Sequence, residues 1–132
     1  MADTVLFGSD EWLNAYVELF NKNTTVRDAL KDLTARVAYE FTDRPDITPK
    51  YVFISGGAID EHGAVTDIGD MDYVIKANYA IWKSMTEGET DPMNALMAGK
   101  VKVTGNMAAL LKHADGLQGT FEVVEAIPTV FD

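Results

Sequence analysis

Glycine and proline divide residues 88–107 into short segments, and their spacing constrains the fold more than any other feature of the sequence. Asp91-Pro92 is typical of a helix start, because aspartate caps the first turn and proline fits there without losing a hydrogen bond. Gly99 would end this helix, and Lys100–Thr104 then alternates apolar and polar residues as a strand does. Gly105-Asn106 turns the chain into a further apolar segment. Such closely spaced helices and strands indicate an α+β protein.

The same alternation of helices and strands extends along the whole chain. Helical spacing of apolar residues predicts helices, and a two-residue period predicts strands. The segment 121–131 fits both periods, and we favour a helix there, after an interruption at Gly116 and Gly119. Because no linker or change of composition divides the chain, residues 1–132 are expected to form a single domain. The other expected helices are 10–20, 25–33, 81–88, 92–98 and 107–111, and the expected strands are 36–42, 50–55, 71–77 and 100–104, with a short strand near Val65.

Acidic residues outnumber basic ones by 21 to 11, which gives the chain a formal net charge of −10. A field of this sign repels nucleic acid and anionic membrane surfaces, so neither is an expected partner. No apolar run approaches the roughly 20 residues that cross a bilayer, and stable membrane insertion is not expected. The chain has no cysteine, which excludes disulfides and fits a reducing compartment. Since residues 1–10 do not resemble a secretory signal and the last residues do not form a peroxisomal address, we expect a cytoplasmic location.

The motifs that usually mark enzymes and metal sites are incomplete. Phe53–Gly57 lacks the first glycine of a nucleophile elbow, and Gly99-Lys100 lacks the other residues of a phosphate-binding loop. His62 and His113 each lack a second histidine at ligand spacing, which argues against zinc. The spacing of a calcium loop is also missing from the acidic cluster of Asp67, Asp70 and Asp72. We therefore expect no catalytic residue, no metal ion and no cofactor.

One signature runs from Gly88 to Met107: a glycine, an Asp-Pro helix, a Gly-Lys strand of alternating aliphatic residues, a Gly-Asn turn and an apolar helix. In this order the parts resemble the sterol-carrier-protein family, firmly over residues 72–111 and only loosely before them. The resemblance implies a curved, mainly antiparallel sheet of about five strands. It also implies that helices cover one face of this sheet and enclose a hydrophobic tunnel, with fatty acids, acyl chains and sterols as the classes of ligand.

Methionine is concentrated in the later part of the chain, where five of the six methionines lie between residues 71 and 107. Its flexible thioether side chain can repack around ligands of varied outline, so these residues suit either a loosely packed core or the lining of a lipid cavity. Trp12 and Trp82 fall on helices that should cover the sheet, and both are expected to be buried. The resemblance favours a cavity, for which the expected ligand-binding residues are Trp82, Met85, Met93, Leu96, Met97, Met107, Leu110, Leu111, Phe121, Val124 and Ile127.

The expected function is non-catalytic binding and transfer of a hydrophobic small molecule, such as a fatty acid, an acyl chain or a sterol-like lipid. Two alternatives stay open. The first is a small enzyme for a steroid-like substrate, in which Tyr73 or Tyr79 would act beside a buried Asp72. The second is a protein-interaction or dimerisation domain whose apolar groove accepts a partner's helix, so a homodimer is compatible with the sequence.

Overall fold

Strand β2 (Thr34–Phe41) lies at the centre of a five-stranded sheet with the strand order β4-β3-β2-β5-β6. The computed structural model describes residues 4–131. β2 and β5 are parallel, whereas every other neighbouring pair in this sheet is antiparallel. The α+β class and the mainly antiparallel sheet are thus confirmed. The other strands are β3 (Lys50–Ser55), β4 (Ala58–Ala64), β5 (Tyr73–Ala77) and β6 (Lys102–Thr104).

The two-residue period of β2 decides which of its side chains enter the core. Val37 and Phe41 are buried on the inner face, with the half-buried Tyr39 between them. Arg36 and Glu40 occupy the alternate positions, as the sequence predicts. β2 has a partner strand on each side and so lies in the middle of the sheet. Its inner-face side chains therefore lie beneath the helices.

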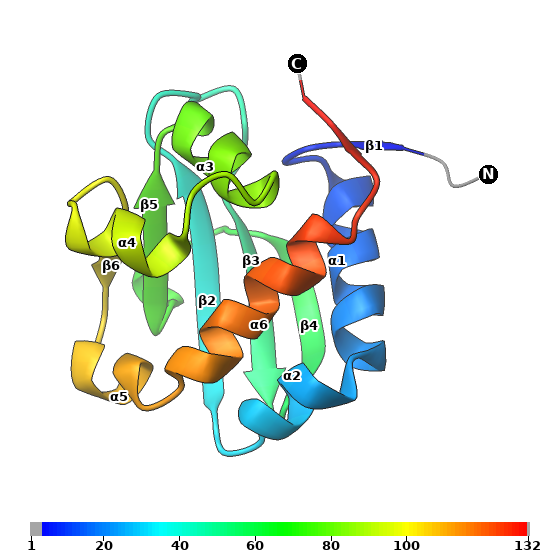
Figure 1. Cartoon of the computed structure of the whole chain (residues 1–132), viewed down its shortest axis with the longest axis vertical. Coiled ribbons are helices and arrows are strands. Elements are labelled where there is room, and N and C mark those ends of the chain that lie inside the picture. Colours follow the sequence, from blue (N-terminus) through cyan, green and yellow to red (C-terminus); the bar gives the residue numbers. More distant parts are fainter. Residues whose placement is uncertain (1–3, 132) are drawn as a thin grey trace.

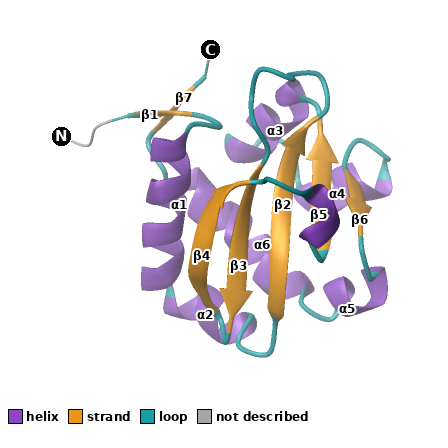
Figure 2. Cartoon of the chain, turned by 180° about the vertical axis from the view of Figure 1, so that it is seen from behind, coloured by secondary structure: helices purple, strands orange, loops and turns teal. Residues whose placement is uncertain are grey.

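The helices lie on one face of the sheet, which also agrees with the prediction (Figure 1). The view from behind shows the sheet in front and most of the helices beyond it (Figure 2). Among the described residues, no helix is both long enough and apolar enough to pass through a membrane. The helices are α1 (Asp10–Lys22), α2 (Thr24–Ala29), α3 (Tyr79–Thr86), α4 (Pro92–Met97), α5 (Met107–Leu111) and α6 (Ala114–Glu125), and a 3₁₀ turn, η1, spans Ile68–Asp70.

Helix α1 begins where its capping residue predicts. The Ser9 side chain accepts a hydrogen bond from the backbone N–H of Trp12 at 3.2 Å, which satisfies one of the free amides of the first turn. Asp10 and Glu11 follow in that turn, where negative charge is favourable. The inner face of the helix buries Trp12, Leu13, Tyr16 and Phe20.

The predicted interruption at Gly116 and Gly119 is wrong, because both glycines lie inside α6. A Cβ atom on Gly116 would lie 2.3 Å from the Leu30 Cδ2 atom, and one on Gly119 would lie 2.6 Å from the Val26 Cγ2 atom. The glycines therefore let α6 approach the α2 region more closely than any larger residue could. Figure 1 shows the consequence, with α6 running diagonally across the sheet.

The chain after Gly56-Gly57 also differs from the expectation. We predicted a short strand near Val65, but the strand is β4, which starts at Ala58 and ends at Ala64. Both glycines have positive φ, +59° and +84°, as a tight hairpin turn requires. The turn joins β3 directly to β4, so β4 begins earlier than its few apolar residues indicate.

Only part of residues 121–131 is helical. Helix α6 ends at Glu125, and Thr129–Val130 forms the short strand β7. β7 pairs in parallel with β1 (Val5–Leu6), a strand that the sequence did not indicate. This pairing holds the two ends of the described chain side by side (Figure 1).

Asn21 fastens α1 to the sheet. Its side-chain amide donates to the backbone carbonyl of Ile59 at 3.1 Å and accepts from the Ile59 N–H at 2.8 Å. Replacing Asn21 by alanine should lower the free energy of unfolding by about 2 kcal/mol, because both backbone groups lose their partner. Urea denaturation measures this loss. Asn14 is the control, since it is exposed and its side chain hydrogen bonds to the exposed His62, and an equal loss for Asn14→Ala would contradict the role of Asn21.

Candidate functional site

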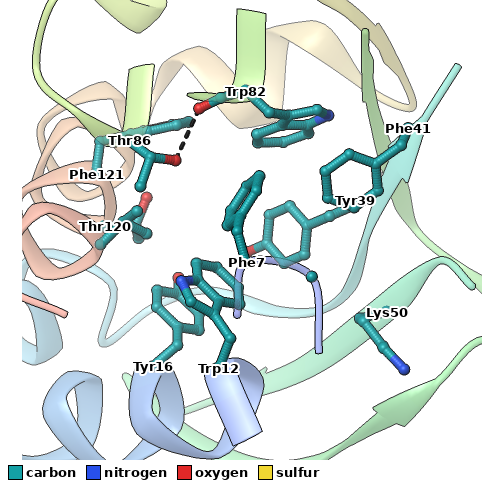
Figure 3. A pocket seen from close by; sticks show the side chains of 12 residues that line it. Phe7, Trp12, Tyr16, Tyr39, Phe41, Lys50, Trp82, Thr86, Thr120 and Phe121 are labelled. Atoms are coloured by element: carbon teal, nitrogen blue, oxygen red, sulfur yellow. Dashed lines mark hydrogen bonds between the residues drawn. The ribbon is translucent and has the colours of Figure 1, made fainter. Parts of the chain in front are cut away.

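An apolar cavity lies between the sheet and helices α1, α3 and α6, with a volume of about 30 Å³. Most of its walls are aromatic rings, and we call it the aromatic cavity. Figure 3 shows the rings of Phe7, Trp82 and Tyr39 around the same space. It is lined by Phe7, Gly8, Trp12, Tyr16, Tyr39, Phe41, Lys50, Trp82, Thr86, Thr120, Phe121 and Val124.

A second apolar cavity of about 50 Å³ lies beneath α4, and we call it the methionine cavity. Phe121 on α6 lines both cavities, so its ring stands at the junction between them. Both volumes are far below the roughly 300–1,000 Å³ of usual ligand pockets, so a large guest requires side chains to move. The methionine cavity is lined by Ile75, Met85, Pro92, Met93, Leu96, Val101, Val103, Gln118 and Phe121.

The β1–β7 pairing brings Phe7 over the aromatic cavity. The Phe7 ring packs edge-on against Trp12, with ring centroids 5.1 Å apart, and against Phe41 at 5.4 Å. The ring centroid of Phe131, which follows β7, lies 5.3 Å from that of Phe7. The two terminal segments thus close this side of the cavity with aromatic rings, which gain from such edge contacts beyond their buried area.

Polar atoms in the aromatic cavity are few, and most are uncharged hydroxyl groups. Tyr16 hydrogen bonds to Tyr39 and to Thr120. Burial raises the pKa of the Tyr16 phenol well above its ordinary value, and Tyr39 raises it further, while the Thr120 hydrogen bond opposes the change. Burial also raises the pKa of Tyr39. Both phenols therefore stay neutral at physiological pH.

The raised pKa of Tyr16 predicts a loss of stability at alkaline pH. The unfolded phenol ionises near pH 10, whereas the folded one keeps its proton, so the contribution is complete below pH 10 and is lost above it. We expect the free energy of unfolding to fall by about 1.4 kcal/mol per pH unit for this group. Urea denaturation from pH 8 to 11 measures the slope, and Tyr16→Phe should reduce it. An unchanged slope in that variant would contradict the assignment.

Trp82 is held firmly in the wall of the aromatic cavity. Its indole Nε1 donates to the backbone carbonyl of Glu40 at 3.0 Å, which ties α3 to β2. The Thr86 hydroxyl, one turn later, donates to the Trp82 carbonyl at 2.7 Å. The expectation that Trp82 is buried is confirmed, and so is that for Trp12.

Lys50 carries the one ionic side chain among the described residues that line the aromatic cavity. Its Nζ lies 2.7 Å from Asp10 Oδ1, and this hydrogen bond lowers the pKa of the Asp10 carboxyl. Figure 3 shows the amine directed away from the aromatic rings. Within the described part of the chain, no three His, Asp or Glu residues gather as metal ligands would.

Most of the sequence-predicted site residues line at least one of the two cavities. Trp82, Phe121 and Val124 line the aromatic cavity, whereas Met85, Met93, Leu96 and again Phe121 line the methionine cavity. Ile127 is buried but lines neither of them. Met97 and Leu111 are 83% and 51% exposed and also line neither cavity, while the side chains of Met107 and Leu110 lie outside what the structure describes.

Most of the aromatic cavity was missing from the sequence prediction. The predicted site residues include neither Tyr16 nor Tyr39, and Phe7 lies outside every predicted helix and strand. The signal that could have identified them is the excess of aromatic residues on two facing elements, α1 and β2. Buried tyrosine and tryptophan rings bring polar O–H and N–H groups into an otherwise apolar interior, where these groups usually need hydrogen-bond partners.

Comparison with known proteins gives a consistent result. The chain superposes on a crystal structure of sterol carrier protein 2 with a TM-score of 0.84 and 25% identity, over 92% of this chain and 98% of that one. It superposes on the solution structure of a conserved hypothetical protein from Thermus thermophilus, described as a candidate sterol carrier protein, with a TM-score of 0.78 and 26% identity, over 98% and 94%.

A third similar fold is that of sterol carrier protein 2 from Yarrowia lipolytica in its apo form. The TM-score is 0.61 at 17% identity, over 94% of this chain and 97% of that one. Among curated proteins, none matches this sequence. The model of the SCP-2 sterol transfer family matches residues 13–118, which include the main sheet and most of the helices. This chain therefore belongs to the SCP-2 sterol transfer family.

Proposed function

We propose that this protein binds one long apolar molecule, an acyl chain or a sterol-like lipid, between its sheet and α6, and carries it without chemical change. The observation on which this proposal depends is that two apolar cavities meet at one side chain, Phe121. A guest that displaces the Phe121 ring would join the two spaces into one elongated site. Membership of a lipid-transfer family supports the same function.

The lining of the cavities favours binding by burial of apolar surface. Apart from Lys50, Gln118 and two threonines, the residues around both cavities are apolar, aromatic or glycine. Each methylene that a ligand buries contributes roughly 0.8 kcal/mol, or about a fourfold gain in affinity, before the costs of association. Affinity should thus rise with chain length until the joined space is full. The proposed site residues are those of the two cavities, with Phe121 at their junction.

Extraction of the purified protein with organic solvent, followed by mass spectrometry, tests the proposal directly. We expect a co-purified lipid, and displacement of a fluorescent fatty-acid probe by unlabelled chains, with affinity increasing with length. Absence of bound lipid together with no displacement by any lipid class would refute the carrier function.

The two alternative functions have weaker support from the geometry. The enzyme alternative needs a buried carboxylate, but Asp72 is exposed and accepts a hydrogen bond from the backbone N–H of Arg36 at 2.8 Å. A dimerisation domain would show a concentration-dependent mass in ultracentrifugation without ligand binding. We place the carrier in the cytoplasm, a proposal that rests on the absence of cysteine and is tested by fractionation of the source cells.

A further inference from the structure

The aromatic cavity contains one hydrogen-bond donor that no described residue uses. Trp12 is only 8% exposed, and its buried Nε1 has no hydrogen-bond partner within residues 4–131. Trp82 lines the same cavity, yet its Nε1 already donates to the Glu40 carbonyl. Buried N–H groups nearly always have an acceptor, so the donor of Trp12 points to a guest that supplies one.

The surroundings of Trp12 place this donor at a polar edge of an otherwise apolar space. The indole is stacked on the Tyr16 ring, with centroids 5.7 Å apart and planes within 3° of parallel. Tyr16 in turn hydrogen bonds to Tyr39 and Thr120. Figure 3 shows Trp12 and Tyr16 at the bottom of the cavity, between Thr120 on the left and Tyr39 on the right, with the indole nitrogen on the side of Thr120.

We infer that this polar edge, formed by Trp12, Tyr16, Tyr39 and Thr120, binds an uncharged oxygen acceptor of the ligand, the carbonyl of an ester or ketone or a hydroxyl, through the indole N–H of Trp12. The inference rests on the proposed carrier function and adds to it the chemical class of the ligand's polar group. The rest of the ligand would extend along the apolar walls towards Phe121.

An ionised carboxylate is a poor match for the same edge. A carboxylate in the aromatic cavity would lose its hydration and would find no unpaired cation among the described lining residues. This costs far more free energy than burying a neutral oxygen. The cation that lines the cavity, Lys50, is bound to Asp10 at 2.7 Å and is directed away from the rings in Figure 3. The Tyr16 hydroxyl already hydrogen bonds to Tyr39 and Thr120, so the indole N–H of Trp12 is the donor left for a neutral oxygen of the ligand.

The test compares methyl hexadecanoate with octadecane, which has nearly the same length but no oxygen. Both are delivered from cyclodextrin, and their affinities are measured by displacement of a fluorescent probe in the wild type and in Trp12→Phe. The ratio of the two affinities removes the effect of each compound's solubility in water. We expect Trp12→Phe to lower the ester-to-alkane ratio about tenfold, the usual worth of one well-formed buried hydrogen bond.

Trp82→Phe is the matched control, because it removes the other indole of the same cavity, whose N–H is already bound within the protein. Because Trp82 also lines the cavity, its replacement should weaken the binding of both compounds alike, so the ester-to-alkane ratio should stay within about twofold of the wild type. A second measurement uses the wild-type protein alone. In protein labelled with ¹⁵N at the tryptophan indoles, the NMR signal of the Trp12 indole proton should move downfield when the ester binds and should not do so when the alkane binds. The Trp82 signal should change little with either compound.

The outcomes separate this inference from the carrier function. If both compounds bind but the ester-to-alkane ratio is unchanged in Trp12→Phe, or the Trp12 indole signal does not shift, the role of the polar edge is refuted. The carrier function would still stand. Tighter binding of hexadecanoate than of its methyl ester would overturn the neutral character of the site. Failure of the wild type to bind octadecane, the ester and every other lipid class would overturn both.

Discussion

Replacing Gly57 by alanine is expected to lower the free energy of unfolding by about 4 kcal/mol, which is near the upper end for a single substitution. A Cβ atom at this position would lie 2.2 Å from the carbonyl oxygen of Arg27 and 3.2 Å from the Cα atom of Lys31. These are backbone atoms, so neither can rotate away. The φ angle of +84° adds a cost for any residue with a side chain. The hairpin and the end of α2 would therefore have to separate.

Gly56→Ala provides the control for this prediction. Gly56 lies in the same turn and also has a positive φ, +59°, but nothing lies within 4 Å of a Cβ placed on it. Its substitution should cost only the backbone strain, about 1 kcal/mol. Urea denaturation of both variants gives the difference. Equal losses would contradict the close contact of the β3–β4 turn with the α2 region.

Enlarging the side chain at the junction of the cavities should weaken ligand binding strongly. We expect Phe121→Trp to reduce the affinity for a long-chain fluorescent lipid about thirtyfold, because overfilling the space that the ligand needs costs about 2 kcal/mol. The stability of the unliganded protein should change less, since Phe121 is only half-buried. Displacement titration measures the affinity, and thermal unfolding with and without lipid measures the linked stabilisation.

Met97→Trp is the control for the junction variant. It introduces the same side chain at a residue that is 83% exposed and lines neither cavity. Its affinity for the lipid should remain within about twofold of the wild type, as for ordinary surface substitutions. If Phe121→Trp bound the lipid as tightly as Met97→Trp, the ligand would not pass the junction.

Features governed by local chemistry could be predicted from the sequence. The Ser9 cap and the acidic turn after it place the start of α1, because such signals act within one turn of backbone. Asp91-Pro92 marks the start of α4, where Pro92 lies in the first turn, but the Asp91 side chain makes no capping hydrogen bond. The alternation in β2 also predicted which of its faces is inward. These signals need no knowledge of distant residues, and the structure confirms each of them.

Features that depend on distant neighbours could not be predicted in this way. Gly116 and Gly119 look like helix breakers until Leu30 and Val26 are known to lie against them. The β1–β7 pair joins segments from opposite ends of the described chain, and two residues are too few to show a period.

The candidate site depended on distant neighbours as well. Met97 lies two residues beyond the buried Ala95, so it is turned about 200° from it and faces away from the core. Tyr16 and Tyr39 line the aromatic cavity because α1, which packs against β4, brings the Tyr16 ring centroid to 6.4 Å from that of Tyr39. Neither segment reveals this approach alone. The methionines directed the prediction to the methionine cavity. Of the rings around the aromatic cavity, the predicted site residues include Trp82 and Phe121 alone.

The two edge strands of the five-stranded sheet, β4 and β6, affect how copies of this protein meet at high concentration. β6 is only three residues long and exposes Lys102, and β4 exposes Asp60 and Glu61. If a strand of another copy paired with either edge strand, its residues would lie next to these charged side chains. Together with the strong negative charge of the whole molecule, this keeps the sheet from growing from copy to copy into fibrils.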